Sequence, residues 1–549
     1  MSTVKNPILS GFYPDPSICR VGDSYYIVNS TFAYFPGVPV FESRDLQHFH
    51  QIGNVLTRDS QLPLGDSRMS QGIFAPTIRF HEGVFYMITT NVSHGGNFIV
   101  TAENPAGPWS EPHYLKGAEG IDPSLFFDDD GKCYYIGTRP NPDGVRYNGD
   151  WYIYIQELDL DNFCLVGDYT LAWKGAMRDA EWPEGPHLYK KDGYYYIMHA
   201  EGGTGPAHAV CVARSRDIVG PYVGNFNNPI LTHRHLGKNY PIRYVGHADL
   251  VDTPDGEWYM VMLASRPCEW YTGLGRETFL AKVTWEDGWP VVNDGVGILN
   301  EFQQVGLPEV CELPENSCYT FHTRTLDPHF VTVRNPKPDM YELAGNGSLI
   351  LKTSPETITE KTNASYLGIR QKSYHYTVRT ELRFRPEDAE EAGLVLLQSE
   401  EASVRFVVAA SKGQTVLRIV SFGDRLSGES GEGAGSEESL SGKSGGANES
   451  GSLPEESALP ERFGEIRAEK ALTQKTETLT LAVMQNGQQL TFWYAQEDGR
   501  FERLGPAMDA RFLSTEAAGG FVGNTVGMYT SSNHTATDNR AEFFCFCME

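Results

Sequence analysis

Five segments in the first 300 residues share one layout, and this repeat constrains the fold more than any other feature of the chain. Each segment opens with a short apolar strand, reaches a turn seven or eight residues later, and resumes with an aromatic pair. The segments start at Asp15, Ala75, Asp122, Gly185 and His247. The turns are Gly22-Asp23, Glu82-Gly83, Asp130-Gly131, Asp192-Gly193 and Asp255-Gly256. Gly and Asp tolerate the positive φ of tight hairpins, so each segment predicts antiparallel strands.

The repeat predicts a particular all-β architecture. A strand, a hairpin, two further strands and a closing aromatic make one four-stranded antiparallel sheet, and five such sheets in series predict a five-bladed β-propeller. A stacked sandwich is the alternative, but it does not require near-identical units. We place the propeller domain at residues 1–310.

The remainder of the chain loses the repeat but keeps the β character. Residues 316–549 contain alternating strands such as Tyr376–Phe384 and no long helical period, which predicts a β-sandwich domain. Within it, residues 421–460 are rich in Gly, Ser and Glu and cannot bury enough apolar surface to offset their ordering entropy. We predict a disordered insertion there.

Charge and composition exclude several classes of protein. Lys and Arg total 45 against 71 Asp and Glu, a net charge of −26 that disfavours nucleic-acid binding. No apolar run approaches the ~18 residues of a membrane span. The N-terminus lacks the pattern of a secretory signal, and nine scattered cysteines without a CxxC pair are typical of reduced thiols. These features predict a cytoplasmic protein that acts on a small partner; whether it forms a homo-oligomer is left open.

The register of the repeat predicts a chemical site. The innermost strands of a propeller surround its central channel, so equivalent positions form a ring. Asp15, Asp122 and His247, with Glu184 one residue before its segment start, should therefore converge. Unpaired buried charges are costly, and a convergent group of them usually marks a site. Glycoside hydrolysis needs two carboxyl groups across the scissile bond, and a third acid can raise the pKa of the proton donor. Ring chemistry alone leaves open which acid plays which role.

Six ordered segments resemble those of glycoside hydrolase family 43. They are Phe12–Ser17, Gly120–Phe126, Glu184–Leu188, Ala200–Thr204, Gly246–Ala248 and Leu274–Thr278. The resemblance implies a five-bladed propeller, a C-terminal concanavalin-like β-sandwich, and an inverting, exo-acting pentosidase. It also implies that Asp15 is the general base, Glu184 the general acid and Asp122 the residue that orients Glu184 and tunes its pKa. Inversion requires the base and acid carboxyls to lie ~6.5–9.5 Å apart.

The resemblance also implies residues that bind the substrate. Arg276 would hold sugar hydroxyls and reduce repulsion among the acids, Phe32 and Phe74 would form an apolar wall, and Thr204 and His247 would complete the site. Each has a simpler alternative: Arg276 could be a surface ion pair, and Phe32, Phe74 and His247 could be core residues. In some family members the matching histidine contacts Ca²⁺ or its waters, so a Ca²⁺ ion at His247 is a candidate. The chemistry requires no cofactor.

Many family members carry Trp-Ala-Pro-Asp where this chain has Phe74-Ala75-Pro76-Thr77. This departure alters the pocket wall and leaves the sugar preference open. We expect release of terminal β-1,4-xylose from short xylo-oligosaccharides, with α-L-arabinofuranosidase or dual activity as the alternative. Two further alternatives are a retaining fructan hydrolase, which usually shows Asn-Asp-Pro-Asn near its start, and a non-catalytic sugar-binding propeller. A loop at Gly520–Met528 corresponds to one that closes the active site in relatives, but we assign no site residue in it.

Overall fold

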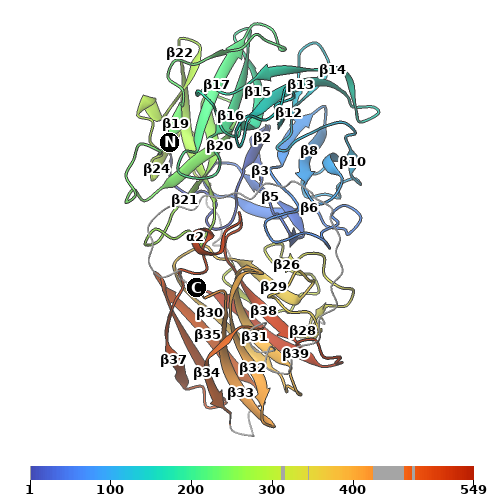
Figure 1. The fold of residues 1–549 in the computed structure, drawn as a ribbon, viewed down its shortest axis with the longest axis vertical. Coiled ribbons are helices and arrows are strands. Elements are labelled where there is room, and N and C mark those ends of the chain that lie inside the picture. Colours follow the sequence, from blue (N-terminus) through green and yellow to red (C-terminus); the bar gives the residue numbers. More distant parts are fainter. Residues whose placement is uncertain (1, 311–315, 344, 425–462, 473–476) are drawn as a thin grey trace.

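The computed structural model describes residues 2–310, 316–343, 345–424, 463–472 and 477–549 (Figure 1). Of the predicted insertion at 421–460, residues 425–460 lie outside the described residues. Ser421 and Phe422 end a regular strand. None of the described helices is long and apolar enough to cross a membrane. The fold is almost entirely β, as predicted.

Five antiparallel sheets follow one another along the first 292 residues. The first two consist of β2 (Ser17–Val21), β3 (Ser24–Val28), β5 (Gly37–Ser43) and β6 (His50–Leu56), and of β7 (Thr77–His81), β8 (Val84–Asn91), β9 (Gly96–Ala102) and β10 (His113–Tyr114). The third consists of β11 (Ser124–Phe127), β12 (Cys133–Pro140), β13 (Trp151–Asp159) and β14 (Cys164–Trp173). The fourth consists of β15 (Glu184–Lys191), β16 (Tyr194–Glu201), β17 (Ala209–Ser215), β18 (Val223–Gly224) and β19 (Leu231–Thr232). The fifth consists of β20 (Arg243–Asp252), β21 (Trp258–Ser265), β22 (Glu277–Glu286) and β23 (Trp289–Val292), followed by the short 3₁₀ turn η1 (Asn293–Gly295).

The five sheets close into a ring. The first strands β2, β7, β11, β15 and β20 are neighbours in that order, and β20 lies beside β2. A small sheet of β1 (Ser2–Lys5) and β24 (Phe302–Val305) joins the two ends of this region. At the predicted hairpin turns glycine adopts positive φ, for example 86° at Gly83 and 82° at Gly131. The predicted propeller is confirmed.

A polar network links all five first strands inside the ring. Asp249 on β20 accepts hydrogen bonds from Ser17 Oγ on β2 (2.7 Å) and from Tyr189 OH on β15 (2.6 Å). Arg79 on β7 donates to both oxygens of the same carboxylate, at 2.8 and 3.1 Å. Ser124 on β11 joins through the ring of His187. These pairs satisfy buried polar groups at the ring axis, so they tie the sheets to one another.

The C-terminal region forms a sandwich of two large sheets, seen below the propeller in Figure 1. One sheet contains β27 (Tyr341–Leu343), β28 (Leu349–Lys352), β39 (Arg540–Met548), β30 (His375–Arg383), β35 (Leu479–Asn486), β36 (Gln489–Ala495) and β37 (Phe501–Asp509), with β25 (Cys318–Tyr319) beside β39. The other contains β29 (Ser365–Arg370), β38 (Thr525–Ser531), β31 (Glu391–Ser399), β32 (Ala402–Ser411), β33 (Gln414–Phe422) and β34 (Glu465–Ala471). Their inner faces share one apolar core, which includes Phe406, Val483 and Phe543.

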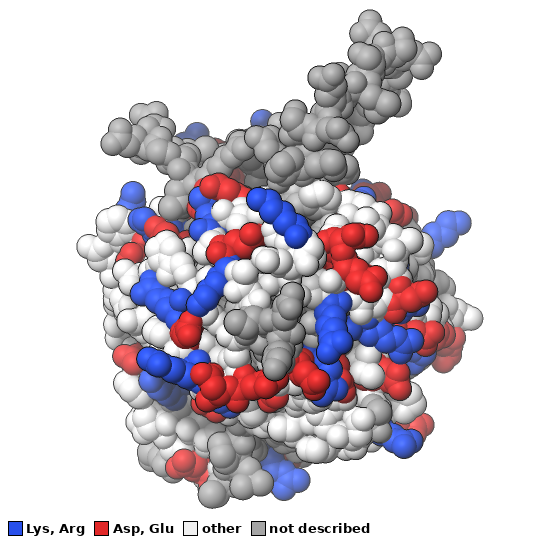
Figure 2. Space-filling model, turned by 90° about the horizontal axis from the view of Figure 1, so that it is seen from below, with Lys and Arg blue, Asp and Glu red and all other residues white. Residues whose placement is uncertain are grey.

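The sandwich packs against the propeller through paired strands and a shared core. β26 (Thr332–Val333) pairs with β4 (Tyr34–Phe35). In the short helix α2 (Thr515–Ala518), the Glu516 carboxylate accepts a hydrogen bond from the backbone N–H of Thr272. One apolar cluster contains Phe12 and Phe32 of the propeller together with Tyr366 and Tyr529 of the sandwich. On the described part of the face seen from below, acidic and basic side chains intermingle (Figure 2). The two regions are joined by apolar packing, by strand pairing and by hydrogen bonds such as that from the Thr272 N–H to Glu516.

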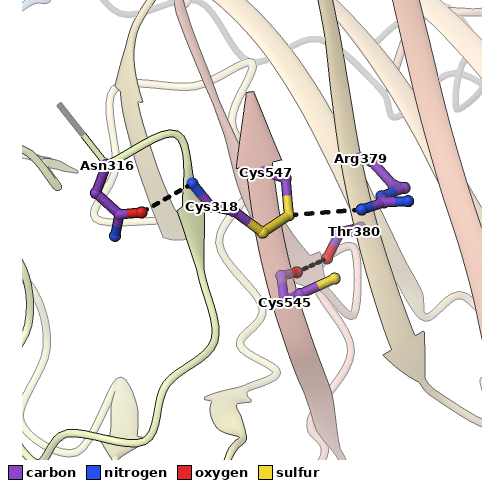
Figure 3. The surroundings of a disulfide bond; sticks show 6 residues. All are labelled: Asn316, Cys318, Arg379, Thr380, Cys545 and Cys547. Carbon is purple, nitrogen blue, oxygen red and sulfur yellow. Dashed lines mark hydrogen bonds between the residues drawn. A yellow bond between two sulfur atoms is a disulfide. The ribbon is translucent and has the colours of Figure 1, made fainter. Parts of the chain in front are cut away.

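Two cysteines differ from their predicted state. Cys318 on β25 and Cys547 on β39 are opposite each other in the antiparallel pair, and their sulfur atoms are bonded (Figure 3). The expectation of nine reduced thiols is therefore wrong for this pair. The two cysteines meet because their strands pair, although the residues are 229 positions apart in the sequence. The local spacing of cysteines gives no sign of this pairing. Cys545, two residues earlier on β39, is a free thiol.

Candidate active site

The predicted acids lie where the first strands of the propeller begin. Asp15 and Asp122 each stand two residues before their strand, at φ of 52° and 55°, and His247 in β20 has φ of 50°. Left-handed backbone at three equivalent non-glycine positions is uncommon, and such conformations cluster at functional sites. The repeat thus extends to the backbone conformation of the residues that carry the chemistry.

Contacts bring four of the predicted residues together. Arg276 Nη1 donates to Asp15 Oδ1 at 2.8 Å, and His247 Nδ1 lies 3.9 Å from the same oxygen. Asp122 accepts a hydrogen bond from the backbone N–H of Gly185 and interacts electrostatically with Asp15, His247 and Arg276. Asp15, Asp122, His247 and Arg276 are all buried. We call these four residues, together with Glu184, the axial cluster.

Asp15 is held as a carboxylate. Burial alone would raise its pKa, but the Arg276 guanidinium, His247 and a 2.5 Å hydrogen bond from Ser30 Oγ outweigh burial. The pKa of Asp15 therefore lies below its ordinary value. A carboxylate that stays ionised near neutral pH can accept a proton from water.

Asp122 is shifted in the opposite direction. Burial raises the pKa of Asp122, and the negative charge of Asp15 raises it further, while His247, the Gly185 N–H and Arg276 oppose the shift. Opposite pKa shifts on two neighbouring carboxyl groups are typical of active sites in which some carboxyl groups hold a proton and others accept one.

Glu184 is positioned by an irregular strand. It is the first residue of β15, its Cα partner is Ala200 on β16, and the register shifts between Glu184 and His187. Such bulges re-aim side chains next to active sites. The adjacent Gly185 allows the His247 ring to approach, because a Cβ at residue 185 would lie 2.7 Å from that ring. Glu184 is therefore tied through its neighbour to both Asp122 and His247.

An aromatic wall stands beside the axial cluster. Phe32 lies 5.3 Å from Phe74 between ring centroids, and the Arg276 guanidinium carbon lies 5.7 Å from the Phe32 ring. Phe521 of the sandwich completes the wall, stacked on Phe32 at 6.0 Å and 5.8 Å from the same guanidinium carbon. Phe32 is almost fully buried, whereas Phe74 and Phe521 keep part of their surface exposed. The wall is thus built from both domains.

Sequence reasoning assigned no role to Phe521. Its backbone N–H donates to Ser70 Oγ of the propeller, and Gly523 packs against Leu274 and Gly275. The nearby Thr525 is fully buried between Tyr34 and Tyr366. An aromatic residue following two glycines was the available signal, but nothing local shows which surface such a loop reaches.

Sequence reasoning also missed His208. Its Nδ1 lies 2.9 Å from the backbone carbonyl oxygen of Tyr244, and a positive charge on its ring would interact with Asp15 and His247. Burial lowers the pKa of His208 to about 3, so the ring is neutral at ordinary pH. Thr204, the remaining predicted residue, lies partly exposed in the loop after β16, and its role stays a prediction.

A Ca²⁺ ion at His247 would need oxygen ligands around that side chain. Ca²⁺ takes 6–8 oxygen ligands. The carboxylate oxygen beside His247, Asp15 Oδ1, already accepts a hydrogen bond from Arg276. Within the described ranges, the one group of His, Cys, Asp or Glu side chains close enough to share a metal ion is His199, Glu201 and Cys211, which lies elsewhere. Side chains alone do not build a Ca²⁺ cage at His247, and an ion there would depend on water ligands.

Removing Arg276 is expected to change the pH dependence of any activity that uses Asp15 as a base. Because Arg276 lowers the pKa of Asp15, Arg276→Met should raise that pKa and move the acidic limb of kcat/KM to higher pH. Arg276→Lys keeps the charge and should restore part of the shift. An acidic limb that stays in place in Arg276→Met would contradict the role of this ion pair.

The chain is similar to known proteins over its whole length. Residues 4–290 match the model of Glycosyl hydrolases family 43, and residues 318–439 and 458–549 match that of the Beta xylosidase C-terminal Concanavalin A-like domain. A xylosidase/arabinosidase of Butyrivibrio fibrisolvens is 50% identical over 100% of both chains. A non-reducing end alpha-L-arabinofuranosidase of Bacteroides ovatus is 36% identical, covering 99% of this chain and 94% of its own length. The crystal structure of a xylan beta-1,4-xylosidase from Bacillus halodurans superposes with a TM-score of 0.86 at 33% identity, covering 100% of both chains.

Proposed function

The chain belongs to glycosyl hydrolases family 43, and from this premise we propose that it releases terminal β-1,4-linked xylose from short xylo-oligosaccharides by inversion, with terminal α-L-arabinofuranose as a second substrate. Three relatives, one named for both activities and two for one activity each, support the two substrates. They are the xylosidase/arabinosidase at 50% identity, the alpha-L-arabinofuranosidase at 36%, and a beta-xylosidase of Bacillus subtilis at 36% over 71% of this chain. The observation that carries the proposal is the contact among Asp15, Asp122, His247 and Arg276 at the centre of a closed propeller, with Glu184 next to the Gly185 N–H that binds Asp122.

Asp15 acts as the general base in this proposal. Its carboxylate is ionised, because Arg276, His247 and Ser30 offset the cost of burial. One oxygen would accept a proton from water, which attacks the anomeric carbon on the face opposite the leaving group. Arg276 neutralises the charge on Asp15 in the resting site and presents its remaining N–H groups to sugar hydroxyls.

Glu184 acts as the general acid and protonates the departing glycosidic oxygen. Asp122 orients Glu184 through the next residue, because the backbone N–H of Gly185 donates a hydrogen bond to Asp122. When Asp122 is ionised, its negative charge disfavours ionisation of the neighbouring Glu184 and so helps this acid to keep its proton near neutral pH. No step uses a metal ion or an organic cofactor.

The aromatic wall favours a terminal sugar unit. Phe32, Phe74 and Phe521 present apolar surface to the face of a pentose ring, and Phe521 enters from the other domain. A wall assembled from two domains restricts the length of substrate that can pass beyond the terminal unit. This supports exo action on short oligosaccharides.

Truncating Phe521 tests the contribution of the sandwich to binding. Phe521→Ala should raise KM about tenfold, equivalent to about 1.4 kcal/mol, with a smaller change in kcat because the axial cluster is untouched. Phe501→Ala is the matched control, since Phe501 lies 44% exposed on β37 of the same sandwich and outside the wall. Equal KM values in the two variants would remove Phe521 from the binding site.

A panel of aryl glycosides tests the proposed substrates. One preparation is assayed on nitrophenyl β-xylopyranoside, α-L-arabinofuranoside, β-glucopyranoside and β-galactopyranoside. The proposal predicts the highest kcat/KM on the xyloside, measurable turnover of the arabinofuranoside and the lowest values on the hexosides. Arabinofuranoside cleavage that exceeds xyloside cleavage many-fold would reverse the order of the two substrates. Hexoside cleavage alone would overturn the proposal.

A further inference from the structure

Three side chains of ligand type meet in the fourth sheet, away from the axial cluster. His199 and Glu201 are two residues apart on β16 and therefore share one face of the sheet. Cys211 on β17 is the direct cross-strand partner of His199. One ring nitrogen, one carboxylate oxygen and the sulfur atom all lie within 4.8 Å of one another. The Ala200–Thr204 segment noted in the sequence contributes Glu201 to this group.

The imidazole of His199 is buried without a hydrogen bond. His199 and Cys211 are fully buried and Glu201 is 1% exposed. Neither ring nitrogen of His199 has a hydrogen-bond partner among the described residues. Its Nε2 lies 3.8 Å from Glu201 Oε1, which is too long for a hydrogen bond. An unsatisfied buried polar group costs about 1–3 kcal/mol and calls for a bound water or ion.

The Glu201 carboxylate is held by the backbone of a neighbouring loop. The N–H groups of Ala176 and Met177 lie 3.2 and 3.4 Å from its two oxygens. A Cβ at Gly175, where φ is 111°, would lie 2.9 Å from Glu201 Oε2. Contacts of this kind orient metal ligands from outside the first coordination sphere. The loop backbone thus holds the Glu201 carboxyl group in place beside His199 and Cys211.

We propose that His199, Glu201 and Cys211 bind one Zn²⁺ ion, with a water molecule as the fourth ligand, at a site that stabilises the fold. Imidazole nitrogen, thiolate sulfur and carboxylate oxygen are the three ligand types that Zn²⁺ accepts, whereas Ca²⁺ and Mg²⁺ prefer oxygen alone. On binding, the Cys211 thiol releases its proton to solvent, so thiolate and carboxylate together neutralise the ion. No redox step is involved.

The ion would stabilise the strand beside the general acid. Ala200, between His199 and Glu201, is the Cα partner of Glu184, and the loop at Ala176 and Met177 leads toward β15. Zinc would crosslink β16 and β17 through its ligands, and Glu201 would connect the ion to this loop by hydrogen bonds. The ion would not contact the substrate. Its removal should therefore lower thermal stability more than it changes KM.

Metal analysis of the full-length enzyme tests this site. The protein is expressed with added zinc, purified without chelator, and measured by mass spectrometry of its metal content. The proposal predicts one Zn²⁺ per chain, lost in Cys211→Ser and His199→Gln but retained in Cys133→Ser, whose thiol is buried on β12 of another sheet. Equal zinc in wild type and His199→Gln, or none in wild type after loading, would overturn it.

Cobalt substitution decides the case even where a variant fails to fold. Wild-type enzyme loaded with Co²⁺ should show a thiolate-to-cobalt charge-transfer band, which Cys211→Ser should lack and Cys133→Ser should keep. Zinc should also raise the Tm of the metal-free wild type, because a ligand that binds only the folded state stabilises it. A cobalt spectrum without a thiolate band in the wild type would contradict ligation by Cys211.

Discussion

Asp15→Asn and Glu184→Gln are each expected to lower kcat by about 10²–10⁴-fold on a natural xylo-oligosaccharide. Both substitutions keep the shape of the side chain and remove the proton transfer that the proposal assigns to it. Thermal unfolding of each variant should stay close to that of the wild type, which shows that the fold is retained. The matched controls are Asp23→Asn and Glu181→Gln, two exposed acids near the same strands, which should keep normal rates.

The two variants should differ in their dependence on the leaving group. A general acid matters most when the departing oxygen is basic, so Glu184→Gln should lose far more activity on xylobiose than on a nitrophenyl xyloside. A general base acts on water in either case, so Asp15→Asn should lose similar activity on both. A Glu184→Gln variant that hydrolyses xylobiose within tenfold of the wild-type rate would exclude Glu184 as the acid.

Arg79→Met is expected to lower the free energy of unfolding by about 3–5 kcal/mol, because it leaves the Asp249 carboxylate buried without its main counter-charge. Asp249 is fully buried and Arg79 bonds both of its oxygens. Burial raises the pKa of Asp249, but Arg79, His187 and Tyr189 more than offset it and hold the pKa below its ordinary value. The contribution should therefore be present near neutral pH and be lost as the pH falls through the lowered pKa of Asp249.

Arg20→Met is the matched control for Arg79→Met. Arg20 on β2 pairs with Asp252 on β20, the strand that also carries Asp249, at 3.0 Å, but these side chains are 25% and 42% exposed. Exposed pairs contribute about 0–1 kcal/mol. Calorimetry should show a large loss of Tm in Arg79→Met and a small one in Arg20→Met. Equal losses would mean that the polar network around Asp249 does not hold the ring together.

The propeller could be predicted because its evidence is local and repeated. Each hairpin carries its own Gly or Asp turn, and each repeat start takes an equivalent place around the ring. That equivalence also predicted the convergence of Asp15, Asp122 and His247, and the structure adds that all three share left-handed backbone. The catalytic roles of these residues stay predictions.

The remaining features depend on contacts between distant segments. Phe521 contacts Phe32 across the domain boundary, and Cys318 meets Cys547 through the pairing of two strands that are 229 residues apart in the sequence. His199 and Cys211 are brought together by the pairing of β16 with β17. Because a loop separates the two strands in the sequence, the two residues do not form a recognisable metal-binding motif. Periodicity and turn residues predict strands and their order, but not which loop or distant strand a side chain meets.

The anomer of the first sugar released tests the central claim most directly. Proton NMR follows xylobiose hydrolysis in its first minutes, before mutarotation mixes the anomers. If Asp15 activates water while Glu184 protonates the leaving group, the newly formed xylose is the α-anomer. Initial release of β-xylose would mean retention through a covalent intermediate and would contradict the account.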